Sequence, residues 1–402
     1  MRIGLIGRCL YSFDNEASLR ELAQELTAFG HHCFLFLADK HLQAKDKTIR
    51  FASFHVSAGG KLFPVQVQKA EQDQVSLFVL PGEDAVVFAA AVAVILQKLA
   101  EKGIRLDVMH LFTAKDLCTA LVCRQYYNLP FIYSVRSFVD LKQKKDDFLC
   151  LGLKLPPDSF LSGEYLYTEQ LAAASAQYVV DETAEAKLWP VFFSALAGRY
   201  VAGKPYVQAK FWAKAKEQTR LEYKKELLQR ESPREMVVIT AKKEPVVLSA
   251  TPDRQIVIIP EAKTLEERQQ QYRAADFYWP DDKTSGQQLL TAMAAGCLPL
   301  IPDKGPLAVF MRSEERLKKA CLFYAQGEWE TAFLVAQKEF REKPKSLLFK
   351  RQQLVQAVHE LYSLKAAAAL YDKIYRGFAP VHLPFLLENG QIPAVTGRWE
   401  ER

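Results

Sequence analysis

Several features that would assign this 402-residue chain to a common functional class are missing from it. Its 7 cysteines include no CxxC pair, which argues against a disulfide framework and a zinc ribbon and suits a reducing cytoplasm. The longest apolar stretch, residues 85–96, is well short of the ~20 residues that span a bilayer. No HExxH, GxSxG, P-loop or GxGxxG site occurs, so metalloprotease, hydrolase, NTPase and dehydrogenase functions lack support, and no metal site is predicted.

Charge does not indicate a nucleic-acid partner either. Lys and Arg number 53 against 47 Asp and Glu, a formal charge of +6 that is spread along the chain. Such a mild basic excess suits a diphosphate ligand or an anionic membrane surface. The opening MRIGLIGRCLYSF has too short an apolar run for a signal peptide and predicts a core strand. We therefore expect a cytoplasmic protein with at most peripheral association at the inner face of the plasma membrane.

Apolar strands and helices alternate through the first half of the chain. Continuous apolar strands separated by helices predict a parallel sheet covered on both faces, as in a doubly wound α/β domain. Strands are expected at residues 3–7, 32–38, 75–80, 107–112, 131–135 and 176–181, with helices at 17–30, 85–96, 114–127 and 164–174.

The second half repeats this architecture after a looser segment. Residues 210–230 predict a helix of interleaved charges, whose outer face is either solvated or docks a partner or membrane. Strands are expected at 236–241, 254–260, 276–280 and 297–302, with helices at 265–275 and 287–295. A long helix at about 346–376 precedes an irregular tail with three prolines. We predict domains at 1–190 and 236–345, a linker at 191–235, and a closing helix with its tail at 346–402.

One passage resembles a known family. Residues 272–305, YRAADFYWPDDKTSGQQLLTAMAAGCLPLIPDKG, resemble the donor-site passage of group 1 (GT4-type) glycosyltransferases: a strand ending in Pro, a Gly-bearing loop, a helix with Ala-Met, a Gly turn and a buried strand. GHHCFLFLAD at 30–39 and DVMHLF at 107–112 are similar to other family passages in the same order. The resemblance implies an α/β protein of the GT-B fold, with two Rossmann-type parallel-sheet domains facing a cleft and a long C-terminal helix.

The resemblance also implies an activity. A family member transfers a sugar, with retention, from a nucleoside-diphosphate sugar to a glycan, lipid or protein acceptor, and requires no other cofactor. At the start of the second domain, the family's Arg and Lys neutralise the donor diphosphate. Lys242 and Lys243 follow the 236–241 strand in this chain and suit that role, although loop lysines are commonly just exposed.

The loop at residues 283–286 is the second candidate for donor binding. Ser285 and Gly286 precede a helix, so their amides form either an anion site or an ordinary capped turn. Thr284 adds a hydroxyl donor, and Lys283 compensates phosphate charge.

Three residues of the first domain are further candidates. Arg136, at a strand end, matches a family branch with "YEVRGF" and either contacts the transferred sugar or forms a domain-packing ion pair. Arg8 is a candidate phosphate or acceptor contact. His110 ends a strand, where it either contacts the acceptor or is structural.

This sequence departs from the family pattern at three places. Family members usually carry two glutamates where Lys283 and Thr291 stand, and paired glycines where Asn15, Glu16 and Ala17 stand. Only about fifteen residues separate the strands at 236–241 and 254–260, so the second domain is expected to be abridged. A second hypothesis therefore stays open: a catalytically inactive relative that binds a glycan or serves as a subunit of a glycosyltransferase complex.

Overall fold

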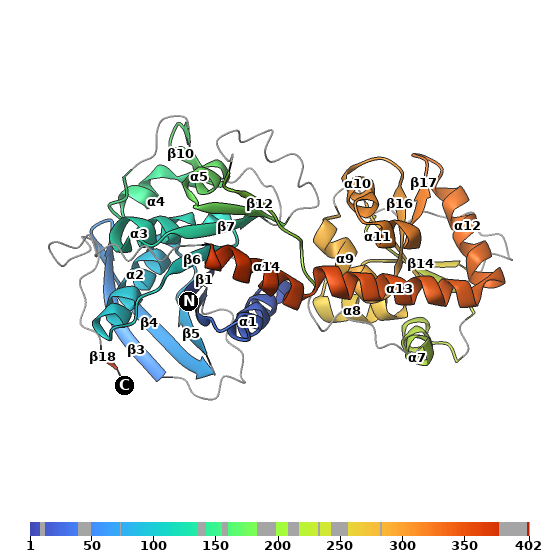
Figure 1. The fold of residues 1–402 in the computed structure, drawn as a ribbon, viewed down its shortest axis with the longest axis horizontal. Coiled ribbons are helices and arrows are strands. Elements are labelled where there is room, and N and C mark those ends of the chain that lie inside the picture. Colours follow the sequence, from blue (N-terminus) through green and yellow to red (C-terminus); the bar gives the residue numbers. More distant parts are fainter. Residues whose placement is uncertain are drawn as a thin grey trace. The chain divides into compact units, whose positions relative to one another are not determined.

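A computed structural model describes residues 1–8, 13–38, 50–72, 74–135, 142–154, 160–182, 198–207, 217–231, 234–242, 256–281, 284–377 and 400–401. The chain divides into two compact units (Figure 1). The first comprises Met1–Glu182, Ala186–Gly203 and Ala368–Arg402, and the second comprises Thr183–Glu185 and Lys204–Ala367. Each unit is built around its own sheet.

The main sheet of the first unit has the strand order β12-β11-β7-β6-β1-β2-β5-β4-β3-β18. From β12 to β5 all neighbours are parallel, which confirms the predicted Rossmann-type sheet. The strands are β1 Arg2–Gly7, β2 His32–Ala38, β3 Arg50–Ala58, β4 Lys61–Gln72, β5 Val75–Leu80, β6 Val108–Leu111, β7 Phe131–Val135, β11 Tyr178–Asp181, β12 Tyr200–Ala202 and β18 Glu400–Glu401.

One edge of this sheet differs from the expectation, because β3, β4 and β18 are antiparallel. Strands β3 and β4 form a hairpin whose turn residues Gly59 and Gly60 have φ of 55° and 76°, the region that glycine adopts without steric cost. Buried apolar residues alternate with polar ones along the hairpin, as at Val65 and Val67. Because apolar and polar residues alternate here, β3 and β4 contain no continuous apolar run. The other strands are predicted from such runs, and these two are therefore not predicted.

The helices of the first unit include the apolar segment noted in the sequence, now α2. Its residues 86–96 are buried, and Asp84 caps it by accepting hydrogen bonds from the N–H groups of Val86 at 2.7 Å and Val87 at 3.2 Å. None of the described helices is long and apolar enough to cross a membrane. The helical elements are α1 Phe13–Thr27, α2 Ala85–Glu101, η2 Ala114–Asp116, α3 Leu117–Tyr127, α4 Lys145–Leu149 and α5 Thr168–Ser175; a small sheet comprises β8 Lys142–Lys144, β9 Leu161–Ser162 and β10 Tyr165–Tyr167.

The second unit has a five-stranded, wholly parallel sheet in the order β14-β13-β15-β16-β17. The second Rossmann-type domain is thus confirmed. Its strands are β13 Met236–Thr240, β14 Ile256–Pro260, β15 Phe277–Trp279, β16 Leu298–Pro302 and β17 Leu322–Tyr324; its helices are α7 Glu217–Leu228, α8 Leu265–Ala274, α9 Gly286–Ala294, α10 Pro306–Arg312, α11 Glu315–Ala320, α12 Trp329–Glu342 and α13 Pro344–Tyr362.

The inner face of the charged helix α7 is tied to this sheet by buried ions. Lys224 Nζ lies 2.6 Å from Asp276 Oδ2, at the start of β15, and Arg351 Nη2 of α13 lies 2.6 Å from Asp276 Oδ1. All three side chains are buried. Burial alone would raise the pKa of Asp276, but Arg351 and Lys224 together hold it below its usual value.

The long C-terminal helix is confirmed as a helical segment but consists of two helices, α13 and α14 Leu364–Arg376. Ser363 separates them: its backbone is extended and bridges Val207, and its hydroxyl accepts a hydrogen bond from Ala366 N–H at 3.2 Å. Most of the proline-containing tail lies outside the described residues.

Candidate functional site

The predicted donor-site residues of the second unit that the structure describes, Lys242 and Thr284 to Gly286, lie at one edge of its sheet. Because all strands run in parallel, their carboxyl ends share an edge, where helix N-termini also converge. Thr240 is the last residue of β13 and is in register with Pro260 of β14 and Trp279 of β15. Lys242 therefore follows the central one of three neighbouring strand ends.

Lys242 is half-buried and lies against an aromatic ring. Its Nζ atom is 4.1 Å from the centroid of the Trp279 ring, and its backbone N–H donates to Thr240 Oγ1 at 3.1 Å. Trp279 is fully buried, and its indole N–H donates to Tyr324 at 2.8 Å. A cation–π contact of this kind positions the ammonium group at the sheet edge. The neighbouring Lys243 lies outside the described residues.

Two of the described residues before α9, Asp281 and Thr284, are joined by hydrogen bonds. The Thr284 hydroxyl donates to Asp281 Oδ1 at 2.7 Å and accepts from Asp281 N–H at 3.0 Å. Ser285 is exposed and caps α9 by accepting from Gln288 N–H at 3.2 Å, and Gly286 is the first helical residue. The positive end of the α9 dipole thus lies at the same edge as Lys242. Lys283 lies outside the described residues.

Sequence reasoning missed one ionisable group at this edge, Glu261, the first residue after β14. Tyr272 and the Gln288 side-chain amide both donate hydrogen bonds to its carboxylate, and Arg268 Nε is 3.6 Å from Oε1. Burial raises the pKa of Glu261 despite these donors. Its position directly after the apolar strand β14, as Lys242 lies shortly after β13, was the available signal.

In the first unit, Arg8 follows β1 at the carboxyl edge and is buried. Its guanidinium donates to Asp116 Oδ1 at 3.1 Å, to the Lys115 carbonyl at 2.8 Å and to the Gly82 carbonyl at 3.3 Å. These bonds connect the segments that follow β1, β5 and β6. A phosphate or acceptor contact for Arg8 stays a prediction.

His110 is completely buried in β6, within a chain of polar side chains. Its Nδ1 lies 2.6 Å from the Tyr375 hydroxyl and its Nε2 lies 2.8 Å from Ser134 Oγ. Ser134 Oγ lies 2.8 Å from the Tyr371 hydroxyl, which in turn donates to Glu182. These contacts connect His110 of β6 to α14, and an acceptor contact stays a prediction.

The remaining expectations concern Arg136 and metals. Arg136 lies outside the described residues, so its predicted role is neither supported nor opposed. Within the described part of the chain, His, Cys, Asp and Glu side chains form no group of three or more that could hold a metal ion.

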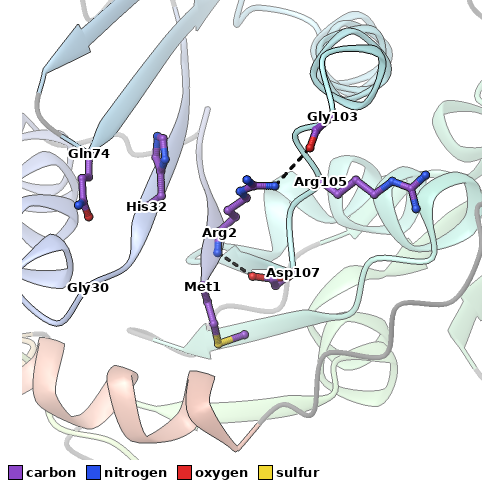
Figure 2. A pocket seen from close by; sticks show the side chains of 8 residues that line it. All are labelled: Met1, Arg2, Gly30, His32, Gln74, Gly103, Arg105 and Asp107. Atoms are coloured by element: carbon purple, nitrogen blue, oxygen red, sulfur yellow. Dashed lines mark hydrogen bonds between the residues drawn. The ribbon is translucent and has the colours of Figure 1, made fainter.

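A pocket of about 540 Å³ lies elsewhere on the first unit (Figure 2). It is lined by residues that begin or immediately precede parallel strands, among them Arg2, His32, Gln74 and Asp107. Arg2 spans part of it, donating through its backbone N–H to Asp107 Oδ2 at 2.7 Å and through Nη1 to the Gly103 carbonyl at 3.5 Å. This is the amino edge of the sheet, opposite to the edge at which Arg8 lies.

Comparison with solved structures defines the fold class. The catalytic domain of starch synthase IV from Arabidopsis thaliana, bound to ADP and acarbose, matches with a TM-score of 0.73 and 13% identity, over 94% of this chain and 98% of that one. Sucrose-phosphate synthase from Thermosynechococcus elongatus matches with a TM-score of 0.58 and 13% identity, over 94% and 98%. HepE from Anabaena, in complex with UDP, matches with a TM-score of 0.54 and 10% identity, over 94% and 100%.

The chain therefore has the GT-B fold of these glycosyltransferases. At such low identity, the likeness establishes the fold alone. No family model and no curated protein matches the sequence.

Proposed function

We propose that this protein is a GT4-type glycosyltransferase that transfers a sugar, with retention, from a nucleoside-diphosphate sugar to a glycan, lipid or protein acceptor. The observation that carries the proposal is the edge of the second sheet. There, Lys242 and the capped N-terminus of α9 follow neighbouring parallel strands within a GT-B fold. Two of the similar structures were solved with a nucleoside diphosphate, ADP in one and UDP in the other.

The second unit would bind the donor. A leaving nucleoside diphosphate gains negative charge as the sugar–phosphate bond breaks, so catalysis requires positive groups fixed before the reaction. Lys242 is fixed by Trp279, and the α9 N-terminus supplies oriented amides. Lys243 and Lys283 would add charge, while Arg136 and His110 remain candidates on the sugar and acceptor side. No further cofactor is required by this scheme.

A second function is favoured by the residues that depart from the family pattern. Lys283 and Thr291 replace the two glutamates, and the Thr291 hydroxyl donates to the Gln287 carbonyl of its own helix at 2.9 Å. A catalytically inactive relative that binds a glycan or a second glycosyltransferase subunit would tolerate those changes. In either function we place the protein in the cytoplasm, with at most peripheral contact with the inner face of the plasma membrane.

Calorimetry with UDP-, GDP- and ADP-sugars separates the two functions. The enzyme hypothesis expects saturable binding of one donor and sugar transfer to a suitable acceptor. It expects Lys242→Met to weaken donor binding about tenfold or more, because a charge-assisted contact to phosphate is lost. Lys263→Met, which removes an exposed lysine after β14, is the matched control.

Two outcomes would oppose the enzyme hypothesis. The first is absence of donor binding at millimolar concentration, which would leave the subunit hypothesis. The second is equal donor binding by the Lys242 and Lys263 variants, which would show that Lys242 does not contact the diphosphate and would remove the observation on which the proposal rests.

A further inference from the structure

The most informative unassigned group in the second unit is the carboxylate of Glu261. Its exposed fraction is 9%, yet it lies at the carboxyl edge of the sheet, where the donor is proposed to bind. The backbone N–H of Glu261 donates to the Thr240 carbonyl at 2.8 Å. This bond places Glu261 beside the end of β13, because Thr240 is the last residue of that strand and lies two residues before Lys242. Burial of an acid is costly unless it is paired or functional, and Glu261 is both largely buried and paired, at an edge where helix N-termini converge.

The turn that carries Glu261 is held rigidly by α8. Gln271 accepts a hydrogen bond from Ala262 N–H at 2.8 Å and donates to the Pro260 carbonyl at 3.1 Å. Arg268 Nε donates to the Ala262 carbonyl at 3.2 Å. Main-chain positions on both sides of Glu261 are therefore set by α8 side chains, as in a preorganised binding group.

The carboxylate itself faces the helix that carried the missing family glutamate. Gln288, which donates to Glu261 Oε2, lies one helical turn before Thr291, and residues three apart lie on the same helix face. The carboxylate of Glu261, which directly follows β14, thus lies against the face of α9 that also carries Thr291, where family members usually have a glutamate.

Glu261 keeps capacity to accept further hydrogen bonds. A carboxylate has about four acceptor positions, and Tyr272 and Gln288 occupy two of them, one on each oxygen. Arg268 Nε, at 3.6 Å from Oε1, supplies charge without a short hydrogen bond. A group arranged in this way suits neutral hydroxyl donors rather than phosphate, which it would repel.

We infer that Glu261 accepts hydrogen bonds from the ribose hydroxyls of the donor nucleotide, an assignment that rests on the proposed function. Lys242 and the α9 N-terminus then hold the diphosphate while Glu261 recognises the adjoining sugar of the nucleoside. The site would discriminate ribonucleotides from deoxyribonucleotides, because a hydroxyl-binding site leaves its polar group unpaired when the hydroxyl is missing.

The test compares UDP, GDP and ADP with their 2′-deoxy and 3′-deoxy counterparts by calorimetry. For the nucleotide that binds, the unaltered protein should prefer the ribose form about tenfold or more over at least one deoxy form. In Glu261→Gln that preference should disappear, because the affinity for the ribonucleotide should fall to that for the deoxy form. Glu266→Gln, at an exposed acid on α8, should keep the preference.

The outcomes are distinguishable from failure of the proposed function. If the unaltered protein binds a ribonucleotide but shows no preference over either deoxy form, the inference is wrong while the proposed function stands. The same holds if Glu261→Gln keeps the full preference. The comparison within the unaltered protein requires no variant to fold, so it can overturn the inference even if Glu261→Gln is destabilised. Absence of binding by every nucleotide would overturn the proposed function and this assignment together.

Discussion

Lys242 Nζ lies 4.1 Å above the centroid of the fully buried Trp279 ring, so a residue on one strand end is positioned by the last residue of the neighbouring strand. The contact links the core of the second unit to the proposed donor site. A flexible lysine in solution would lose side-chain entropy on binding phosphate, whereas one already placed over a ring has lost part of it beforehand.

The first prediction tests whether Lys242 contributes to stability or chiefly to donor binding. Lys242→Met should lower the free energy of unfolding by only about 0.5–1 kcal/mol, the usual strength of a partly exposed cation–π contact. Lys242→Arg should retain that stability, because a guanidinium also packs on an aromatic face. Chemical denaturation measures both. A loss above about 2 kcal/mol in the Met variant would mean that Lys242 is chiefly structural.

The buried ions around Asp276 predict a larger effect. Lys224→Met removes one of its two cationic partners and should destabilise the second unit by about 3 kcal/mol, because the buried carboxylate is then incompletely compensated. Lys225→Met is the matched control: it is adjacent on α7 but exposed, and should change stability by less than about 0.5 kcal/mol. Urea denaturation measures the free energy of unfolding of both variants, and equal values would contradict the prediction that Lys224 stabilises the second unit through Asp276.

The same cluster predicts a pH dependence. The pKa of Asp276 in the folded protein lies below its ordinary value of 3.8, so the unfolded chain binds the proton more tightly. The stabilisation is therefore fully present above about pH 3.8 and is lost as the pH falls through the lower folded pKa. In Lys224→Met the folded pKa should rise, so the stability difference from the unaltered protein should narrow on acidification. A difference that stays constant down to acid unfolding would oppose this.

Much of the fold follows from the sequence because central parallel strands are continuous apolar runs. The strand at residues 131–135 is predicted residue for residue, and the helix predicted at 85–96 begins as expected but continues to Glu101. The β3–β4 hairpin is not, since an edge strand alternates polar and apolar residues and its partner is decided by tertiary packing.

The candidate site divides in the same way. Lys242 and Ser285 are visible as polar residues that follow a strand or cap a helix. Glu261 is missed because its significance depends on Gln288 and Tyr272, which approach it only in the folded unit. Conversely, the three acceptors of Arg8 come from distant segments, so its burial has no local sequence signal.

A further prediction concerns the polar chain that anchors α14. Tyr371→Phe removes the hydroxyl that joins Ser134 to the buried Glu182, and should cost about 1–3 kcal/mol because buried polar groups lose a partner. Hydrogen exchange should become faster in Leu364–Arg376. Tyr165→Phe, at a tyrosine 42% exposed, is the control and should change little. Unchanged exchange in α14 would show that the anchor lies elsewhere.

His110 allows the two hypotheses about it to be separated. If it anchors α14, His110→Gln should lower stability and loosen α14 as Tyr371→Phe does. Retained stability and retained protection of α14, together with lost acceptor turnover, would instead support the predicted substrate contact.

Two glycines with the same backbone angle provide the last test. Gly296 and Gly327 both have φ of 91°, a conformation that strains any residue with a Cβ atom. A Cβ at Gly296 would lie 2.4 Å from Arg220 Nη2, whose guanidinium donates to the Ala295 carbonyl at 2.9 Å, whereas a Cβ at Gly327 meets nothing within 4 Å. Gly327→Ala should therefore cost about 1–2 kcal/mol from backbone strain alone. Gly296→Ala should cost about 1–3 kcal/mol more, because the buried Arg220 must move or the backbone must shift. Equal losses in thermal denaturation would mean that Arg220 moves aside freely, and that its hydrogen bonds at the end of α9 contribute little to holding α7 in place.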